Sequence, residues 1–169
     1  MKTLFLLRHA KSSWKEPDLP DLERPLNERG RKAAKLVGQY IARQEITLDL
    51  VVSSPAVRAR QTIELVLRSA RRSVELRFDQ RIYEASAAQL LEIISQIEDD
   101  RQSVLLVGHN PGMEELLALL VSGEQHMPTA SLARLSLHVK KWEKIPGGKA
   151  ELSEFVRAKE HKPEDATRR

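Results

Sequence analysis

The sequence contains no cysteine and no apolar run that approaches the length of a membrane span. The lack of cysteine excludes disulfide bridges, thiol nucleophiles and thiolate metal ligands. A membrane-spanning helix needs about 18 or more consecutive apolar residues, and the first apolar run meets Arg8 too early to be a signal peptide. We therefore expect a cytoplasmic protein with no membrane partner, whose nucleophile comes from another residue type.

The net positive charge is modest, and half of it lies at the C-terminus. Residues 157–169 hold five Lys or Arg and three Asp or Glu, a net of +2 out of a formal net charge of +4. The rest of the chain is nearly balanced and lacks the basic, aromatic-interleaved surface of nucleic-acid readers, so we expect no nucleic-acid partner. The 169 residues suit one domain, which we place over 1–157, followed by a charged, disordered tail over 158–169.

Apolar runs and helix caps alternate along the chain. Short runs that end in polar residues predict buried strands over 4–7, 48–53, 74–78 and 104–107. Helical spacing of apolar residues follows four expected caps, which are Asn27, Ser54-Pro55, Ser86 and Asn110-Pro111. Such strand and helix alternation is typical of βαβ units, with a mainly parallel sheet and right-handed crossovers.

The pattern changes near the C-terminal end of the domain. Residues 133–139 alternate between apolar and polar, which indicates a half-exposed strand. Pro146-Gly147-Gly148 reads as a turn, and a further strand over 150–156 would complete a hairpin. The predicted fold is therefore an α/β single-domain three-layer sandwich, with a mainly parallel central sheet, an antiparallel edge and helices on both faces.

Basic and imidazole side chains stand where the predicted strands end. Arg8 and His9 follow the first strand, Gly108 and His109 follow the strand over 104–107, and Arg58 comes just after the second strand. The carboxyl ends of strands in an open α/β sheet face the ligand crevice. Arginine binds phosphate oxygens in a planar, bidentate manner. Together these positions predict that 4–7 and 104–107 are adjacent central strands whose crevice binds a phosphoryl group.

Two histidines facing one phosphoryl group suggest a division of roles. One would attack phosphorus, and the other, if protonated, would stabilise the trigonal transition state. The attacking ring must be neutral at the attacking nitrogen, which a hydrogen bond from its other nitrogen to a carbonyl would enforce. No metal is needed if the arginines supply the charge.

Four segments resemble the motifs of the histidine phosphatase superfamily, and in particular of the small SixA-type phosphohistidine phosphatases with a phosphoglycerate mutase-like fold. Arg8-His9-Ala10 is similar to the Arg-His-Gly motif, with Ala10 in the place of glycine. The run Ser-Pro-Ala-Val-Arg-Ala-Arg-Gln-Thr over 54–62 is similar to Ser-Pro-x-x-Arg-Ala-x-Gln-Thr. His109 resembles the second histidine of the family, and the segment 24–30 resembles the segment that opens the family's first helix.

The resemblance implies a role for each matched residue. His9 would be the phosphorylated nucleophile, Arg8 and Arg58 would bind the phosphoryl oxygens, and His109 would be the second catalytic histidine. Glu84 aligns with the acid that protonates a leaving oxygen in larger relatives; a surface carboxylate or a partner for Arg58 is the alternative. Further candidates for phosphate binding are Lys11, Ser12 and Asn110.

Several functions remain open at this stage. The resemblance favours metal-independent hydrolysis of protein phosphohistidine, with a phosphotransfer or phosphocarrier domain as partner and no cofactor. A phosphatase of small phosphate esters or sugar phosphates would use the same mechanism. A non-catalytic phosphate-binding module is a third possibility, and a metallohydrolase built on His9, Glu84 and His109 is disfavoured because the sequence lacks a short-spaced ligand pair such as His-x-His.

Overall fold

The architecture is built around two parallel strands at the centre of one sheet. It is seen in a computed structural model that describes residues 1–147 and 150–158. The sheet has six strands in the order β3-β2-β4-β1-β5-β6. The strands are β1 (Lys2–Arg8), β2 (Leu50–Ser53), β3 (Leu76–Phe78), β4 (Ser103–Gly108), β5 (Ser131–Leu137) and β6 (Ala150–Arg157). The first four strands are mutually parallel, whereas β5 is antiparallel to β1 and to β6.

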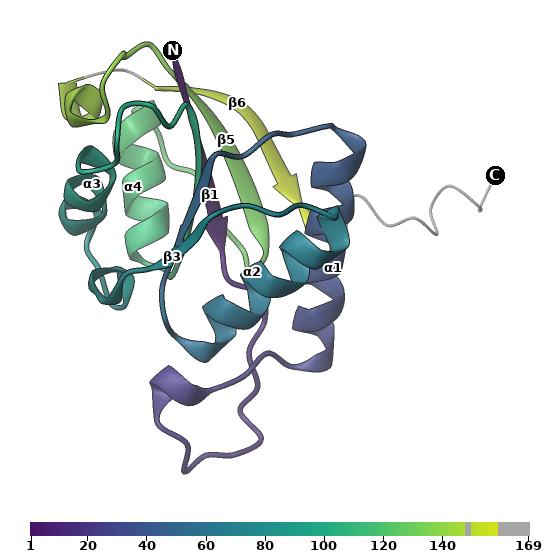
Figure 1. Ribbon diagram of the computed structural model, residues 1–169. Helices are drawn as coiled ribbons and strands as arrows, with labels where there is room; N and C mark the ends of the chain where they lie inside the picture. Colours follow the sequence, from purple (N-terminus) through teal and green to yellow (C-terminus); the bar gives the residue numbers. More distant parts are fainter. Residues whose placement is uncertain (148–149, 159–169) are drawn as a thin grey trace.

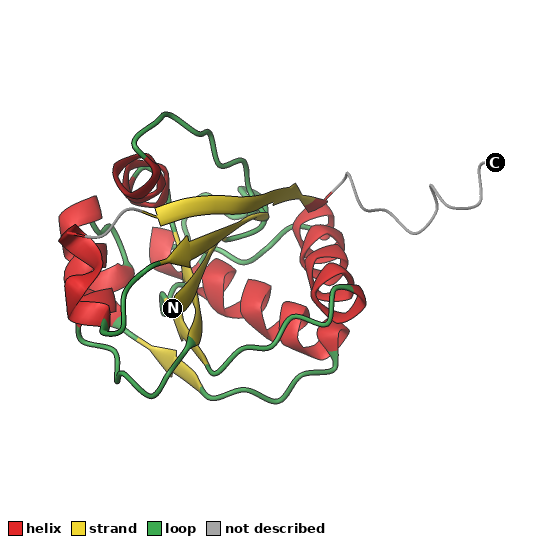
Figure 2. Ribbon diagram, turned by 90° about the horizontal axis from the view of Figure 1, so that it is seen from above, coloured by secondary structure: helices red, strands yellow, loops and turns green. Residues whose placement is uncertain are grey.

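Helices cover both faces of this sheet, which makes three layers (Figures 1 and 2). The helices are α1 (Glu28–Arg43), α2 (Val57–Ala70), α3 (Ala87–Ser95) and α4 (Gly112–Val121). Leu4 and Leu6 of β1 belong to the core under α3 and α4, and Phe5 and Leu7 belong to the core under α1 and α2. Because both faces of β1 are covered, its four central residues, from Leu4 to Leu7, are all apolar. The predicted three-layer fold, with its antiparallel edge, is confirmed.

Two of the four expected helix caps are found at the residues that the sequence indicates. The Asn27 side chain accepts a hydrogen bond from the backbone N–H of Gly30 at 2.8 Å. Ser86 and Gln89 form a reciprocal capping box at the start of α3. Each of these bonds satisfies an amide that the first helical turn leaves without a partner.

The other two expected helix starts are wrong by one or two residues. The helix α2 begins at Val57 rather than Pro55, and its N-cap is Ala56, without a side-chain cap. The N-cap of α4 is Pro111, again without a side-chain cap. The Ser54 hydroxyl accepts the backbone N–H of Ala56 and also contacts the ring of His109, whereas the Asn110 side chain donates to Glu114 and to the carbonyl of Met127. Each of the two side chains thus has a partner that is distant in the sequence.

Smaller differences occur at other boundaries. The second and third strands begin at Leu50 and Leu76, two residues later than expected. Pro146 does not make the expected turn but lies in the 3-10 helix η3 (Trp142–Gly147), and Gly148 falls outside the described residues. Ala158, the first residue of the expected tail, is buried, and 159–169 are not described. Among the described residues, no helix has the length and apolar character that crossing a membrane requires.

The close approach of α1 to α2 gives a test of the packing. A Cβ atom on Gly38 of α1 would lie 2.4 Å from the carbonyl oxygen of Val66 in α2. Because backbone cannot give way cheaply, Gly38→Ala is expected to lower the free energy of unfolding by about 1–3 kcal/mol in urea titrations. Gly123→Ala is the matched control, since nothing lies within 4 Å of its added Cβ. Equal stability of the two variants would contradict this packing.

Candidate active site

The pairing of β1 with β4 brings two histidines together. Arg8 lies opposite Gly108 in the parallel register, and the backbone N–H of His9 donates to the carbonyl of Gly108 at 3.1 Å. The residue that follows each of these two strands is a histidine. The ring centroids of His9 and His109 are 4.9 Å apart, with 54° between the ring planes. Both imidazoles therefore face one crevice at the carboxyl edge of the sheet.

The ring of His9 is held with one nitrogen free. Its Nδ1 lies 2.7 Å from the carbonyl oxygen of Ala10, which can only accept, so Nδ1 carries the proton and donates. Burial, followed by the nearby charges of Arg58 and Arg8, lowers the pKa of His9 to about 4. At neutral pH the ring is uncharged, and Nε2 keeps its lone pair. This is the state that a histidine nucleophile requires.

His109 is also uncharged in the free protein. Burial, then the proximity of His9 and Arg58, lowers the pKa of His109 to about 3. Its Nε2 lies 2.7 Å from the hydroxyl of Ser54, and its ring packs edge-on against Tyr83. The roles expected from the sequence include a protonated second histidine. Protonation of His109 therefore needs a neighbouring anion, whose negative charge would raise the pKa of the His109 ring.

Two arginines add positive charge to the crevice. Arg58, which is 6% exposed, donates to the backbone carbonyl of Asp21 at 2.6 Å and to its carboxylate at 2.9 Å. Arg8 donates to the carbonyl of Met127 at 2.9 Å. Within the described residues, the buried Nε of each arginine and the buried Nδ1 of His109 have no hydrogen-bond partner. Buried polar groups normally find a partner, so these atoms suit an anionic ligand.

Asp21 holds the arginine network in place, a role that sequence reasoning missed. Its carboxylate accepts hydrogen bonds from Arg58, from the Tyr83 hydroxyl at 2.5 Å and from Arg24 Nε at 3.0 Å. These contacts, that of Tyr83 most strongly, keep the pKa of Asp21 well below its usual range. The carboxylate is therefore ionised throughout the working pH range. No sequence pattern links Asp21 to Arg58, 37 residues away.

The crevice opens into a pocket of about 430 Å³ that Arg58, Tyr83, Glu84, His109 and Asn110 help to line. His9 does not line this pocket, but its ring centroid lies 4.9 Å from that of His109, which does. Glu84 is exposed at the rim and has a φ of 59°, in the left-handed region that non-glycine residues seldom adopt. Among the described residues, no three His, Asp or Glu side chains are grouped to hold a metal ion. His9, Glu84 and His109 are therefore not a ligand set.

The remaining candidates lie at the edge of the crevice or beyond it. Asn110 donates to the carboxylate of Glu114 at 2.6 Å and to the carbonyl of Met127 at 3.0 Å. The hydroxyl of Ser12 accepts from Arg24 at 2.7 Å. Lys11 is exposed and lines a different pocket. The structure thus places Ser12 among the supports of the network and Lys11 outside it.

The backbone next to His9 is anchored by α2. The Ala10 N–H donates to the Thr62 hydroxyl at 3.0 Å, and this hydroxyl donates to the Arg58 carbonyl at 2.7 Å. Ala10 is fully buried and has no positive φ, so the backbone here does not need glycine. The contact links the first motif to the second, and Thr62 belongs to the run that the sequence singled out.

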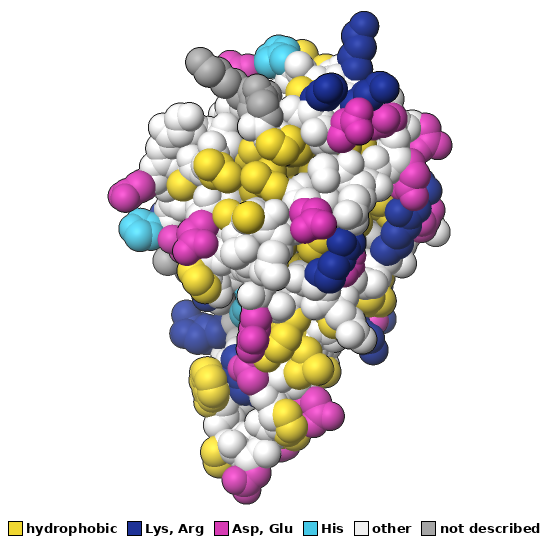
Figure 3. Space-filling model, turned by 90° about the vertical axis from the view of Figure 1, so that its left-hand side faces the viewer, with side chains coloured by type: hydrophobic (Ala, Val, Ile, Leu, Met, Phe, Trp, Pro, Cys, Tyr) yellow, Lys and Arg dark blue, Asp and Glu magenta, His cyan; other side chains and the backbone are white. Residues whose placement is uncertain are grey.

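The segment between β1 and α1 projects from this end of the molecule (Figure 1). It contains the short 3-10 helix η1 (Asp21–Glu23). Trp14 stacks on the guanidinium of Arg24, whose Cζ lies 3.6 Å from the centroid of the Trp14 ring. Trp14 is nevertheless 73% exposed. Leu22 is also exposed, and Figure 3 shows hydrophobic side chains on this lower projection. The Trp14 stack is connected to Arg58 through Arg24 and Asp21.

Comparison with known proteins agrees with this geometry. The sequence model of the histidine phosphatase superfamily (branch 1) matches residues 4–99, more than half of the chain. The chain belongs to the histidine phosphatase superfamily. It is a SixA-type member: the structure of a SixA from Agrobacterium tumefaciens, described as a candidate phosphohistidine phosphatase, is 31% identical, with a TM-score of 0.79. That match covers 92% of this chain and 97% of the other. The superfamily identifies the protein as a phosphatase.

Other relatives extend the comparison. An uncharacterized chloroplastic protein of Arabidopsis thaliana is 30% identical over 161 residues, which are 87% of this chain and 74% of that protein. An uncharacterized protein of Mycobacterium tuberculosis is 34% identical over 119 residues, covering 69% and 70%. The protein histidine phosphatase SixA complexed with tungstate shares the fold at 20% identity, with a TM-score of 0.78 and coverage of 95% and 99%.

The lowered pKa of His9 predicts how activity depends on pH. The active form is the neutral ring, so activity is lost as pH falls through the pKa of about 4 rather than through the ordinary 6.5. After correction for ionisation of the substrate, kcat/KM for p-nitrophenyl phosphate should stay level from neutral pH to about pH 5 and fall only below it. A midpoint near 6.5 would show that the nucleophile is not buried as described.

The role of Asp21 gives a second prediction for the phosphatase. Asp21→Asn should lower kcat/KM by about tenfold or more, because a small displacement of the guanidinium of Arg58 is costly in catalysis. Asp18→Asn, an exposed carboxylate in the same segment, is the control and should leave kcat/KM unchanged. An increase for Asp21→Asn would mean instead that its carboxylate competes with the phosphoryl group for Arg58.

Proposed function

We propose that the protein hydrolyses phosphohistidine in a partner protein, through a phosphorylated intermediate on His9. The observation that carries the proposal is the hydrogen bond from His9 Nδ1 to the Ala10 carbonyl. This bond leaves a neutral Nε2 as the attacking atom, close to the His109 ring and to two arginines. No other histidine in the described residues combines burial with a fixed tautomer in this way.

The reaction proceeds in two transfers. The lone pair of His9 Nε2 attacks phosphorus, and the N–P bond to the enzyme forms while the N–P bond of the substrate breaks. The substrate imidazole leaves with its bonding electrons and takes up a proton. Water then attacks the phosphorylated His9, releasing orthophosphate and restoring the neutral ring. Because the leaving group is an imidazole rather than an alkoxide, this step demands less of a general acid than ester hydrolysis does.

Charge stabilisation comes from the side chains around His9. Arg8 and Arg58 supply fixed positive charge to the equatorial oxygens of the transferring group. A phosphoryl dianion beside His109 would raise its pKa, so this ring becomes a proton donor only when substrate is present. In this proposal Glu84, which lines the pocket and is exposed, donates a proton when the leaving group needs one.

The surroundings of the pocket support a protein substrate. A small metabolite needs most of its surface buried in order to bind well. Between α2 and β4 the chain holds only a short strand, the 3-10 helix η2 (Gln80–Ile82) and α3, with short connections that build no enclosing lid. The exposed Trp14 and Leu22 lie on the segment that projects beside the pocket. The SixA relative from Agrobacterium tumefaciens is likewise described as a candidate phosphohistidine phosphatase.

The distinct roles of the two histidines can be separated by labelling. His9→Ala should abolish both turnover and acid-labile phosphorylation of the enzyme. His109→Ala should retain traces of activity, since the loss of one electrostatic stabiliser costs about a hundred- to a thousandfold in turnover. The test measures turnover and incorporation of labelled phosphate. Labelling that survives in His9→Ala would assign the nucleophile to another residue.

The substrate class is tested by direct comparison. The purified protein is offered a phosphohistidine-bearing phosphocarrier domain and a panel of small phosphate esters and sugar phosphates, with and without a chelator. Faster hydrolysis of the protein phosphohistidine, unaffected by the chelator, is the expected result. A small ester that is hydrolysed faster than the protein would favour the metabolite phosphatase, and loss of turnover on chelation would indicate a metal-dependent reaction.

A further inference from the structure

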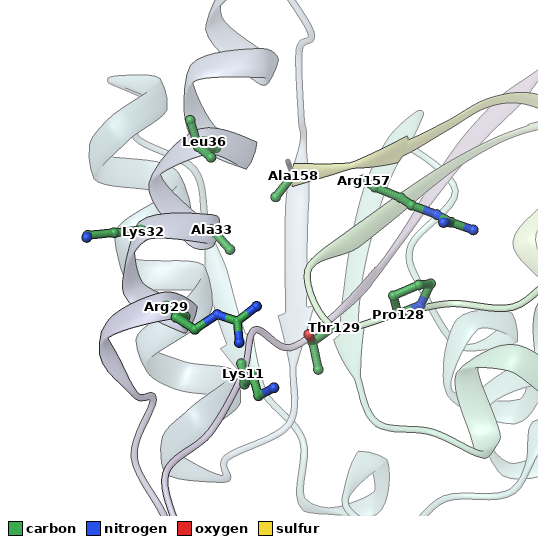
Figure 4. Close-up of a pocket in the computed structure, with 9 residues that line it drawn as sticks. All are labelled: Lys11, Arg29, Lys32, Ala33, Leu36, Pro128, Thr129, Arg157 and Ala158. Carbon is green, nitrogen blue, oxygen red and sulfur yellow. The ribbon is translucent and has the colours of Figure 1, made fainter. Parts of the chain in front are cut away.

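A second pocket lies on the other side of the segment that bears His9. It has a volume of about 360 Å³ and is bounded by the first turns of α1, the end of β6 and the backbone around Thr129 (Figure 4). Four of its nine lining residues are basic, namely Lys11, Arg29, Lys32 and Arg157, and none is acidic. The phosphatase mechanism uses none of these side chains, so the concentration of positive charge needs another explanation.

These cations are largely unneutralised. Within the described part of the chain, Lys11, Arg29 and Arg157 have no ion-pair partner; Lys32 has only Glu28 at 3.7 Å, and both side chains of that pair are about three-quarters exposed. An exposed pair of this kind contributes little free energy and is screened by salt. The pocket therefore presents a net positive surface.

The arrangement of the cations favours a broad ligand over a small one. Figure 4 shows Arg29 reaching over Lys11, whereas the Lys32 side chain extends outward on one side of the pocket and the Arg157 side chain extends outward on the opposite side. The four charges thus form a basic band from α1 to β6 rather than converging on one point. A small anion would contact only part of such a band, whereas a protein surface that bears several carboxylates would match its length.

The basic band also lies next to the reacting groups. Lys11 is two residues after His9, so their Cα atoms are at most about 7 Å apart. Thr129 precedes Ala130, whose backbone N–H donates to the carbonyls of Arg8 and His9 at 3.1 Å. A typical protein interface covers about 800 Å² on each partner. A protein whose phosphohistidine reaches His9 would therefore extend over the basic band as well.

The backbone beneath the basic band is rigidly packed. A Cβ atom on Gly30 would lie 2.1 Å from the carbonyl oxygen of Lys11, which shows how closely α1 approaches the segment after His9. The same carbonyl accepts the backbone N–H of Asn27 at 3.0 Å. Arg29 and Lys11 are thus presented from fixed positions, and a partner would not have to order this backbone on binding.

We propose that the basic band formed by Lys11, Arg29, Lys32 and Arg157 is a docking surface for an acidic face of the phosphohistidine-bearing substrate protein. The inference rests on the proposed function, because it assumes a protein substrate at His9. Docking through charges around the reacting centre would raise the rate of productive encounter and would select acidic partners.

The test compares two charge-reversed pairs in the full-length protein. Arg29→Glu/Arg157→Glu alters the basic band, and Lys35→Glu/Arg68→Glu makes the same change in net charge at basic residues of α1 and α2 that do not line the pocket. Each variant is assayed with a phosphohistidine phosphocarrier domain that has an acidic face, and with p-nitrophenyl phosphate, at low and high salt. The ester reports on folding and on the chemistry alone.

The first pair should lose about tenfold or more in kcat/KM for the protein substrate at low salt, through a slower encounter, and the loss should shrink as salt screens the charges. The activity of the first pair on the ester should change by less than about twofold, as expected for surface positions. The activity of the control pair should change as little on both substrates.

Normal hydrolysis of the protein substrate by the first pair, or equal losses in the two pairs, would overturn the docking surface and leave the proposed function intact. Failure of the unaltered enzyme to hydrolyse any protein phosphohistidine would overturn both.

Discussion

The parallel pairing of β1 with β4 is the constraint on which the site depends. Six consecutive residue pairs, from Thr3 with Ser103 to Arg8 with Gly108, bring the two strands to an end at the same level. A shift of one residue would turn each apolar side chain toward the opposite core, so the packing of both helix layers maintains this register. The histidines that follow the strands are positioned by the core itself, and their approach needs no flexible loop.

Burial of these histidines among arginines has a cost that the network around Asp21 offsets. The low dielectric environment and the two positive charges keep His9 and His109 neutral, and they leave the guanidinium groups in need of an anion. In the free protein Asp21 supplies that charge to Arg58. In the proposed function, a phosphoryl group brings further negative charge to the unpartnered polar atoms of the two arginines and His109.

Helix caps show why some local predictions succeeded and others failed. Asn27 and Ser86 cap their helices through a side-chain oxygen that accepts a backbone N–H of the first helical turn. Ser54 has the same capping chemistry, but its hydroxyl lies 2.7 Å from the buried ring of His109. Asn110 likewise bonds Glu114 and Met127. At these two strand ends, hydrogen bonds to His109 and Met127 compete with a capping bond worth about 1 kcal/mol.

The sequence by itself determined the strand and helix order, the covered central strands and the four residues Arg8, His9, Arg58 and His109 that the fold brings to one edge. These follow from apolar periodicity and from polar residues at strand ends, which are local properties of the chain. Only the tertiary structure decided that Asp21, to which the Tyr83 hydroxyl donates, holds Arg58, that Ser54 contacts His109, and that Lys11 lines the second pocket instead of the phosphoryl site. Such contacts join side chains dozens of residues apart, and their partners depend on how loops and helices pack, which periodicity does not encode.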